Sequence, residues 1–404
     1  MTLDRNRFAR VADGLAVALA ASLPWSTSAT GILAVLWLLA IIPTLEFSSL
    51  RRFITIPAGG LPLLLVALGA LGMLWADVSW AERFDGVTSF FKLLFIPLLL
   101  HRFYRSERGR HVLIGFLASC VLLLLVSGLL LAWPQLAWRG GSAAPGVPVK
   151  DYIAQSAMFT VCVLVILRFA YDTWRDASRG LALALCALAL IFLANIFYVA
   201  TSRTALVVIP ILLLLLGYRL FGWKGAAGLV VGCFVLAMAA WPSSSFLRLR
   251  VDSFFSEVGS YRPGGNATSA GERLEFWRKS IGFIKDAPLI GHGTGSIRDQ
   301  FRRSAVGQTG MAGEAAANPH NQIFGVGIQL GLVGIAVLLA MWCAHLMLFR
   351  SASFAAWVGL VVVIQNIVSS LFNSHLFDFT HGWAYVVGVG IAGGVVLKES
   401  VPRR

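Results

Sequence analysis

Long apolar runs alternate with short polar stretches along almost the whole chain. Runs such as 112–133 and 180–199 approach or exceed the roughly 20 apolar residues that cross the hydrocarbon core of a bilayer as a helix. Charged residues and Pro/Gly breaks delimit about twelve such runs, near 11–24, 28–45, 60–76, 87–100, 111–133, 152–171, 180–199, 203–218, 223–241, 320–349, 353–372 and 381–397. The pattern predicts an all-α, polytopic membrane protein with about twelve transmembrane helices.

One polar segment, residues 242–319, interrupts this alternation. It leaves nine predicted transmembrane helices in 1–241 and three in 320–404. We therefore expect one integral membrane domain with a single large loop.

The second half of this loop carries a helical pattern between residues 271 and 285. Its apolar residues recur every three to four positions, at Leu274, Trp277, Ile281 and Ile284. Charged side chains lie largely off this stripe, so we expect an amphipathic helix on the membrane surface. The sequence Asp-Ala-Pro that closes on Pro288 ends the helix.

A glycine-rich segment, 288–296, follows this helix. Its sequence superficially suggests a nucleotide-binding loop, but no β-strand is predicted before it, as such a loop requires. Tight turns that fold the large loop back are the simpler interpretation.

Composition supports a membrane protein. The chain is 58% hydrophobic and 13% charged, whereas soluble domains carry about 25% charged residues. The net charge of +14 would suggest nucleic acid in a soluble protein. Here most basic residues lie in short loops between spans, where they contact anionic membrane lipids, so no nucleic-acid partner is expected.

The basic residues also predict the orientation. They concentrate in alternate short loops, which the positive-inside rule assigns to the cytoplasm. Both termini are then cytoplasmic, and 242–319 lies outside. Five cysteines fall inside apolar runs without CxxC spacing, which predicts neither disulfides nor a zinc site: Cys120, Cys162, Cys186, Cys233 and Cys343.

His320 stands in Asn-Pro-His-Asn-Gln, residues 318–322, at the head of a long apolar helix. Asn318 can cap that helix, and Pro319 suits its first position. The positive helix end disfavours a protonated imidazole, and a neutral one can act as a general base. The alternative is an interfacial histidine without a catalytic role.

Two arginines are also candidate functional residues. Arg203 stands at the outer start of a predicted span, where helix-end N–H groups and a guanidinium make an anion site. Arg273 lies one residue before the apolar stripe of the loop helix. The alternatives are a snorkelling side chain for Arg203 and a solvated one for Arg273. The two arginines and His320 can meet only if the loop folds over the outer ends of the spans.

The acidic residues of the outer face are scattered in short loops, at Asp77, Glu82, Asp85 and Asp151. Divalent cations need clustered carboxylates. We therefore expect no metal site.

Four short motifs come in order around the outer loop. They are Thr-Ser-Arg-Thr-Ala-Leu from 201, Gly-Glu-Arg-Leu-Glu-Phe-Trp from 271, Pro-Leu-Ile-Gly-His-Gly-Thr-Gly from 288, and Pro-His-Asn-Gln from 319 followed by Leu-Gly-Leu-Val-Gly from 330. In order and spacing, over about 190–345, the chain resembles the bacterial O-antigen ligase and O-antigen polymerase superfamily.

The resemblance implies an inverting, metal-independent glycosyltransferase without a cofactor. Its donor would be an O-antigen polysaccharide on undecaprenyl pyrophosphate, and its acceptor lipid A–core oligosaccharide, yielding lipopolysaccharide. The enzyme would lie in the bacterial inner membrane with the large loop and the active site periplasmic. The family's histidine and two arginines map onto His320, Arg203 and Arg273 as catalytic residues. Asn321, Gln322 and Trp277 join the arginines as candidate substrate-binding residues.

Other functions stay open. An O-antigen polymerase or a protein O-oligosaccharyltransferase would share the donor and differ in the acceptor; the late, dominant outer loop favours the ligase. A lipid or glycan transporter is the alternative from another class. Coupled transporters usually place ionisable groups at mid-membrane, and here Lys92 is the main exception to nearly charge-free spans.

Overall fold

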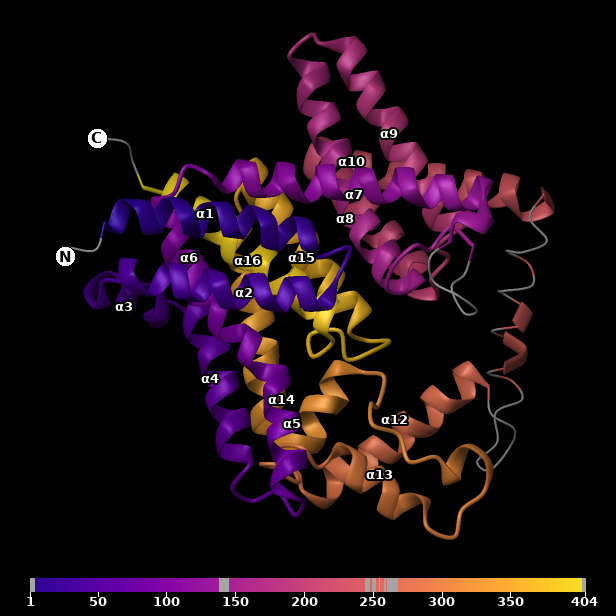
Figure 1. Cartoon of the computed structure of the whole chain (residues 1–404). Coiled ribbons are helices and arrows are strands. Elements are labelled where there is room, and N and C mark those ends of the chain that lie inside the picture. The colour runs from indigo at the N-terminus through magenta and orange to yellow at the C-terminus, as the bar shows by residue number, and fades with distance from the viewer. Residues whose placement is uncertain are drawn as a thin grey trace.

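The computed structural model describes residues 4–137, 145–243 and 268–401, with 248, 252–253, 255–257 and 259 between the last two ranges. Over these residues the chain is helical and has no β-strand (Figure 1). The α-helices are α1 (Arg5–Ser22), α2 (Thr27–Ile41), α3 (Phe47–Thr55), α4 (Pro57–Gly72), α5 (Trp80–Phe91), α6 (Phe95–Arg105), α7 (Gly109–Ala132), α8 (Tyr152–Arg175), α9 (Arg179–Tyr198), α10 (Arg203–Ser243), α12 (Ser269–Asp286), α13 (Ile297–Ala305), α14 (Gln322–Leu348), α15 (Phe354–Ser369) and α16 (Phe379–Glu399).

Within the described residues, eight helical segments are long and apolar enough to cross a membrane, and α3 with α4, bent by 85° at their junction, can form a ninth span. The predicted polytopic, all-α membrane protein is therefore confirmed. Every predicted run coincides with a helix. The three predicted runs that are not among these nine spans fall on α1, α15 and the second half of α10. The count of twelve transmembrane helices therefore stays a prediction.

The chain turns back within α10. Gly222 has a φ of 65° and a ψ of −155°, which no helix contains. A Cβ built on Gly217 would lie 2.8 Å from the carbonyl oxygen of Gly225, so the two halves form a tight hairpin. This turn matches the boundary between the predicted runs 203–218 and 223–241.

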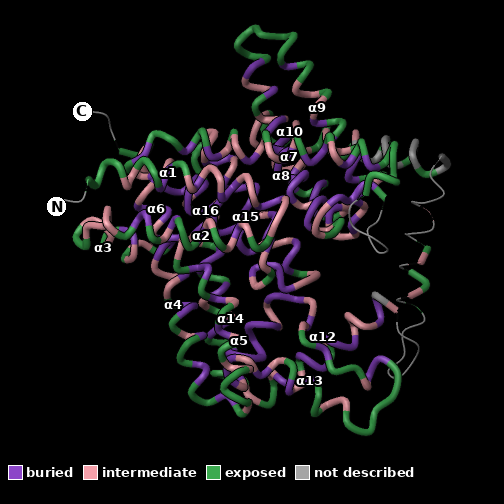
Figure 2. The backbone as a smooth tube through the Cα atoms, viewed as in Figure 1, coloured by how far each residue is buried: buried purple, intermediate pink, exposed green. Residues whose placement is uncertain are grey.

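The helices divide into a central and a lipid-facing set. In α8 and α16, 72% and 78% of the most apolar stretch is buried, against 28% in α9 (Figure 2). The apolar side chains that α9 exposes need lipid around them. The start of α1 and the end of α16 lie on the same side of the molecule, and α12 and α13 lie away from them (Figure 1).

The described cysteine side chains form no disulfide; they are Cys120, Cys162, Cys186 and Cys343. The side chain of Cys233 lies outside the description. Most of the first part of the large loop, up to residue 267, also lies outside it.

The glycine-rich segment is joined to a break in α14. Gly331 has a φ of 62° and a ψ of −158°, so the helical hydrogen bonds stop there. The carbonyl of Ile328 accepts instead from the N–H of His292 at 2.8 Å, and that of Gln329 from Gly293 at 2.9 Å. The segment thus satisfies carbonyls that the break leaves without a helical partner.

The same pairing continues on the other side of the break. Leu332 donates to the carbonyl of Pro288 at 2.8 Å, and Val333 to that of Leu289 at 3.2 Å. A Cβ on Gly331 would lie 2.4 Å from the carbonyl carbon of Leu289, so only glycine fits. The predicted tight turns are confirmed, and they dock the loop onto α14.

The predicted loop helix exists as α12, and it ends at Asp286 as expected. A second apolar face, one position before the stripe expected at the membrane surface, packs against the protein. Phe276 and Phe283 are buried against Phe301 of α13 and Ile328 of α14, whereas Ile281 is 45% exposed. The helix has two adjacent apolar faces, and the phenylalanine face packs inward because it buries more aromatic surface. Its contact with the membrane surface stays a prediction.

We predict that Gly331→Ala destabilises the protein by at least about 1–3 kcal/mol, because the backbone region that residue 331 occupies is essentially restricted to glycine. The measurement is the thermal unfolding temperature of purified protein in detergent. Gly282→Ala is the matched control, since a Cβ there meets nothing within 4 Å. Equal unfolding temperatures for the two variants would contradict the docking role of the break.

Candidate active site

Arg203 is the first residue of α10, and its guanidinium is paired with a carboxylate from the large loop. Its two terminal nitrogens lie 3.2 and 3.4 Å from the carboxylate oxygens of Glu257. Glu257 also accepts a 3.0 Å hydrogen bond from the backbone N–H of Ala270. Burial opposes ionisation of Glu257, but the hydrogen bonds from Arg203 and Ala270 outweigh it and lower its pKa. Glu257 therefore ties the start of α10 to the start of α12.

Arg273 lies half-buried on α12, one turn beyond Ala270. Burial, and then the neighbouring charge of Arg203, lower the pKa of Arg273, which stays protonated near neutral pH. Among the described residues, no hydrogen bond or ion pair engages its guanidinium, although Tyr152 and Glu257 lie within electrostatic reach. Its donors are therefore available to an anion.

His320 is held in one orientation by two asparagines. Its backbone, at a φ of 52°, lets its N–H donate to Asn318 Oδ1 at 2.9 Å. Its ring Nδ1 lies 3.2 Å from Asn373 Oδ1, an amide oxygen that also accepts from the Asn318 side chain. Because an amide oxygen only accepts, Nδ1 carries the proton and Nε2 keeps a lone pair. The ring stacks on Phe276, with 6.0 Å between centroids.

The ionisation of His320 follows the expected direction. Burial, and then the Arg273 charge, lower the pKa of His320. The local geometry differs from the prediction: α14 begins at Gln322, and its cap is Asn321, not Asn318. The reason is that the Asn318 side chain turns onto His320, which leaves the helix start free for the next asparagine.

Asn321 and Gln322 hold the turn between α15 and α16, residues 370–378. Asn321 caps α14 and donates to the carbonyl of Leu371 at 3.1 Å. Gln322 is fully buried, and its side-chain oxygen accepts from the N–H of Leu376 at 3.0 Å. The structure gives both residues contacts within the protein, and their substrate-binding role stays a prediction.

Trp277 lies one turn after Arg273 and packs edge-on against Phe324, with 6.2 Å between ring centroids. Its indole Nε1 is buried and finds no hydrogen-bond partner in the described part of the chain. This donor can still serve a ligand, so the binding role of Trp277 stays a prediction as well.

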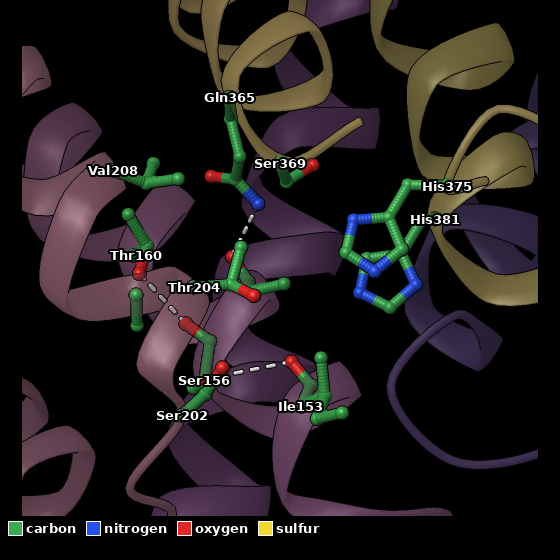
Figure 3. A pocket seen from close by; sticks show the side chains of 12 residues that line it. Ile153, Ser156, Thr160, Ser202, Thr204, Val208, Gln365, Ser369, His375 and His381 are labelled. Carbon is green, nitrogen blue, oxygen red and sulfur yellow. Dashed lines mark hydrogen bonds between the residues drawn. The ribbon is translucent and has the colours of Figure 1, made fainter. Parts of the chain in front are cut away.

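A small cavity, with room for about one water molecule, lies beside Arg203, between α8, α10, α15 and the start of α16 (Figure 3). Ser202 and Thr204, the neighbours of Arg203, line one side of it. His375 and His381 line the opposite side with stacked rings, 4.0 Å between centroids. The charges of Arg273 and His320 both act on His375, which places the cavity next to the predicted site residues.

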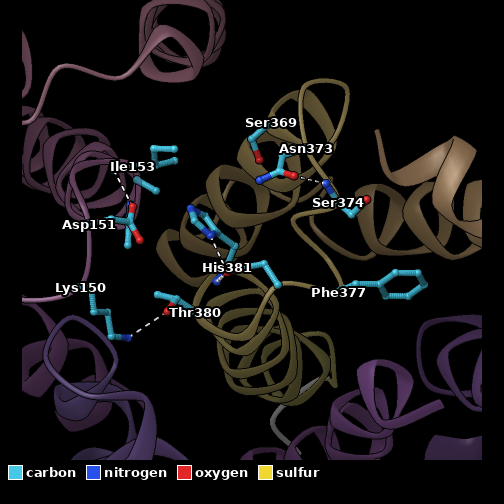
Figure 4. A network of polar contacts seen from close by, with 12 residues as sticks. Lys150, Asp151, Ile153, Ser369, Asn373, Ser374, Phe377, Thr380 and His381 are labelled. Carbon is cyan, nitrogen blue, oxygen red and sulfur yellow. Dashed lines mark hydrogen bonds and ion pairs between the residues drawn. The ribbon is translucent and has the colours of Figure 1, made fainter. Parts of the chain in front are cut away.

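Two lysines fix the wall that carries these histidines. Lys92 donates to the carbonyls of Phe377 and Asp378, at 2.8 Å each, and to that of Leu376 at 3.3 Å. Lys150 donates to the Thr380 hydroxyl at 3.0 Å (Figure 4). The turn 370–378 is thereby clamped to the rest of the fold.

Glu257, His375 and His381 were missed by reasoning from sequence. The histidines lie in the short polar stretch 373–381, whose Asp-x-x-His spacing from Asp378 to His381 was the available signal. Glu257 lies in a segment without hydrophobic periodicity, so no signal pointed to it.

Part of the chain also matches a known family. Residues 188–339 match the model of the O-antigen ligase family. The resemblance to the O-antigen ligase and polymerase superfamily is thereby confirmed. The matched segment contains Arg203, Arg273 and His320. Members of this family are membrane-embedded and act on lipid-linked glycans.

A protein of Haemophilus influenzae described as uncharacterized is 30% identical over 135 residues. The match covers 32% of this chain and 33% of that relative. The chain therefore aligns with about a third of the relative's length.

We predict that His320 titrates below 6.5, the ordinary pKa of its side chain, because burial and the Arg273 charge both disfavour the imidazolium. Arg273→Gln removes that charge and should raise the pKa of His320. Histidine ring NMR shifts against pH measure both values, with His320→Gln to assign the signal. Lys285→Gln, at the exposed far end of α12, should leave the titration unchanged. A wild-type midpoint above 6.5 would contradict this electrostatic account.

Proposed function

We propose that this protein is an O-antigen ligase, a membrane glycosyltransferase that moves O-antigen polysaccharide from undecaprenyl pyrophosphate to lipid A–core oligosaccharide. The observation that carries the proposal is the Arg273 guanidinium, which has no partner among the described residues and acts electrostatically on both Arg203 and His320. A cation beside a second cation and a neutral base fits a reaction with an anionic leaving group and a hydroxyl nucleophile.

The two arginines suit a pyrophosphate leaving group. A guanidinium binds phosphate oxygens bidentately and can neutralise the charge that develops as the glycosidic C–O bond breaks. Arg273 can bind such a group directly, and Arg203 can do so by exchanging Glu257 for it. Among the carboxylates nearby, Glu257 pairs with Arg203 and Asp378 with His381. Glu272 and Glu314 lie within electrostatic reach of Arg273 and His320, but no group of three or more potential metal ligands exists among the described residues. We therefore assign charge neutralisation to the arginines and not to a metal ion.

His320 suits the role of general base. Its Nε2 lone pair can take the proton of the acceptor hydroxyl while the hydroxyl oxygen forms the new bond to the anomeric carbon. The old bond to the pyrophosphate oxygen breaks on the opposite face, and Arg273 and Arg203 take up the charge. Attack opposite the leaving group inverts the anomeric centre.

The positions of the elements support a periplasmic site in the inner membrane. The start of α1 and the end of α16 lie together on one side, in keeping with cytoplasmic termini, and the loop helices lie away from them (Figure 1). Both substrates are lipids, so they would enter laterally between the lipid-facing helices. Lys92 donates to carbonyls of a turn and does not line the cavity, which argues against a transport pathway around it.

The acceptor decides between a ligase and a polymerase. Purified protein in nanodiscs would receive undecaprenyl-pyrophosphate-linked glycan together with lipid A–core, and the products would be resolved by gel electrophoresis. We expect glycan on lipid A–core. Extension of the lipid-linked glycan without any modified lipid A–core would make the protein a polymerase.

We predict that His320→Ala lowers the rate of transfer by about 10²–10⁴-fold, the contribution of a general base. Arg203→Ala and Arg273→Ala should each lower it by about 10²–10³-fold, as expected for loss of a charge-stabilising donor. Lys285→Ala on the same loop helix is the control, and size-exclusion profiles check folding. Near-normal transfer by His320→Ala would remove the base assignment.

We also predict that EDTA leaves the transfer rate unchanged, because two guanidinium groups take the place of a divalent cation. Rates are compared before and after chelation, and again after Mg²⁺ is added. Activity that is lost in EDTA and restored by Mg²⁺ would contradict the arginine-based mechanism.

A further inference from the structure

The glycine-rich segment 288–296 turns its polar side chains inward and its apolar ones outward. Thr294 is fully buried and donates to a carbonyl of α4 at 2.6 Å. Ser296 is 1% exposed and donates to a carbonyl of its own turn at 2.7 Å. At the tip, by contrast, Leu289 is 67% exposed and Ile290 52%. Water favours the opposite distribution, so the tip has a different environment.

The remaining polar side chain of the segment is also engaged. The ring Nε2 of His292 donates to the carbonyl of Phe283 at 2.8 Å. The backbone N–H of Gly295 donates to the side-chain oxygen of Gln329 at 2.8 Å. These bonds add to those that join the segment to the break in α14. At these groups the segment meets the condition for irregular backbone at membrane depth, which must find its partners inside the protein.

The segment lies at the end of a pair of antiparallel helices, α4 and α14 (Figure 1). Near one end of the pair, His345 on α14 donates to the carbonyl of Ala58 at 2.8 Å. Near the other end, a Cβ on Gly72 would lie 2.8 Å from the side chain of Leu330. The N–H of Thr294 donates to the carbonyl of Gly72 at 3.0 Å, so the glycine-rich segment docks at this second end.

The length of α14 sets the depth of that end. The helix ends at Leu348, and the exposed, charged Arg350 follows. From Leu332, just past the break, to Leu348 the helix is roughly 24 Å long at about 1.5 Å per residue. The hydrocarbon core of a bilayer is about 30 Å thick. With one boundary at the end of the helix, the other lies about 6 Å beyond Leu332, and a tilted helix covers still less of the core.

The partner helix α4 gives the same depth independently. It begins at Pro57, directly after the exposed Arg51 and Arg52 of α3. Its 16 residues extend roughly 24 Å, so Gly72 also lies short of the far boundary. The chain stays apolar past this point, with Leu74 69% exposed. Both helices therefore place the docked segment inside the outer edge of the hydrocarbon core.

The exposed tip also continues a surface that faces lipid. On α14, an apolar stripe is exposed from Leu332 and Val333 through Leu339 to Met347. A stripe of this kind on a membrane-spanning helix needs lipid around it. The N–H of Val333 donates to the carbonyl of Leu289 at 3.2 Å, which places the tip at the end of the stripe.

We propose that the segment 288–296 is re-entrant. It enters the leaflet at the Gln322 end of α14, where Leu289 and Ile290 insert among the acyl chains of the lipids. The exposed Lys285 and Asp286 before it lie at the level of the headgroups. The large loop is thereby anchored in the bilayer as well as on α14. This anchor does not depend on the proposed function, under which the leaflet is the periplasmic one.

The test uses single-cysteine variants in a background without the native cysteines. Leu289→Cys and Ile290→Cys are labelled with an environment-sensitive fluorophore and placed in nanodiscs of phosphatidylethanolamine and phosphatidylglycerol, which leave both faces open to water. Val306→Cys is the matched control, because Val306 is an apolar side chain of the same loop, 78% exposed beside the exposed Arg303. Leu339→Cys on the stripe of α14 marks a position in lipid.

We expect lipids that carry a nitroxide near the headgroup end of the chain to quench the labels at 289 and 290. Aqueous iodide should quench them far less than the label at 306. The label at 339 should respond most to a nitroxide near the end of the chain. Iodide quenching at 289 and 290 as strong as at 306 would overturn the proposal. Protection from iodide without quenching by nitroxide lipids would also overturn it, because protein would then cover the tip.

A second arm avoids the bulk of the fluorophore. A membrane-impermeant maleimide reacts with the thiolate, which forms in water and is disfavoured in hydrocarbon. We expect a loss of labelling for Leu289→Cys and Ile290→Cys relative to Val306→Cys, and equal labelling of all three after unfolding in dodecyl sulfate. Size-exclusion profiles check that each variant is folded. Equal labelling of the three folded variants in nanodiscs would contradict insertion of the tip.

Discussion

The break in α14 is the constraint on which the outer half of the molecule depends. A helix that stops at Gly331 leaves backbone groups that lipid cannot satisfy. The glycine-rich segment after α12 satisfies them on both sides of the break, so loop and helix form one unit. Since α12 and α13 pack on this unit, the loop helix is held over the start of α14. As a result, Arg273 on α12 and His320, just before α14, lie within electrostatic reach of each other.

Electrostatics accounts for the rest of the site. Two guanidinium groups within reach of each other in a half-buried place repel, and Glu257 offsets that repulsion by pairing with Arg203. Burial, and then the same positive field, lower the pKa of His320. Across the cavity, the carboxylate of Asp378 pairs with His381. On each side of the site, one acidic residue thus holds a basic side chain in place.

Sequence predicted the helices well, because apolar run length is a local property. It also singled out Arg203, Arg273 and His320, which lie in ordered motifs around one loop and come within electrostatic reach of one another, although their catalytic roles stay predictions. It did not predict His375 and His381, since their approach to His320 depends on how α15 and α16 pack. The inward face of α12, formed by Phe276 and Phe283, was not predicted, because two apolar stripes lie one position apart and only the packing of α13 and α14 selects between them. The N-cap of α14 is Asn321 and not the predicted Asn318 for a similar reason, because the Asn318 side chain bonds to the backbone of His320 instead.

The clamp at Lys92 has a mechanical consequence. One ammonium group donating to three successive carbonyls makes the histidine wall of the cavity move as a rigid part of α5 and α6. The opposite wall belongs to α10, whose most apolar stretch is 33% buried, about as little as the 28% of α9 (Figure 2). Stiffness is therefore distributed unevenly around the cavity. We therefore expect any widening of the cavity to fall on the α10 side, where the buried Ala205 and Val208 line it and the outer face of the helix is exposed.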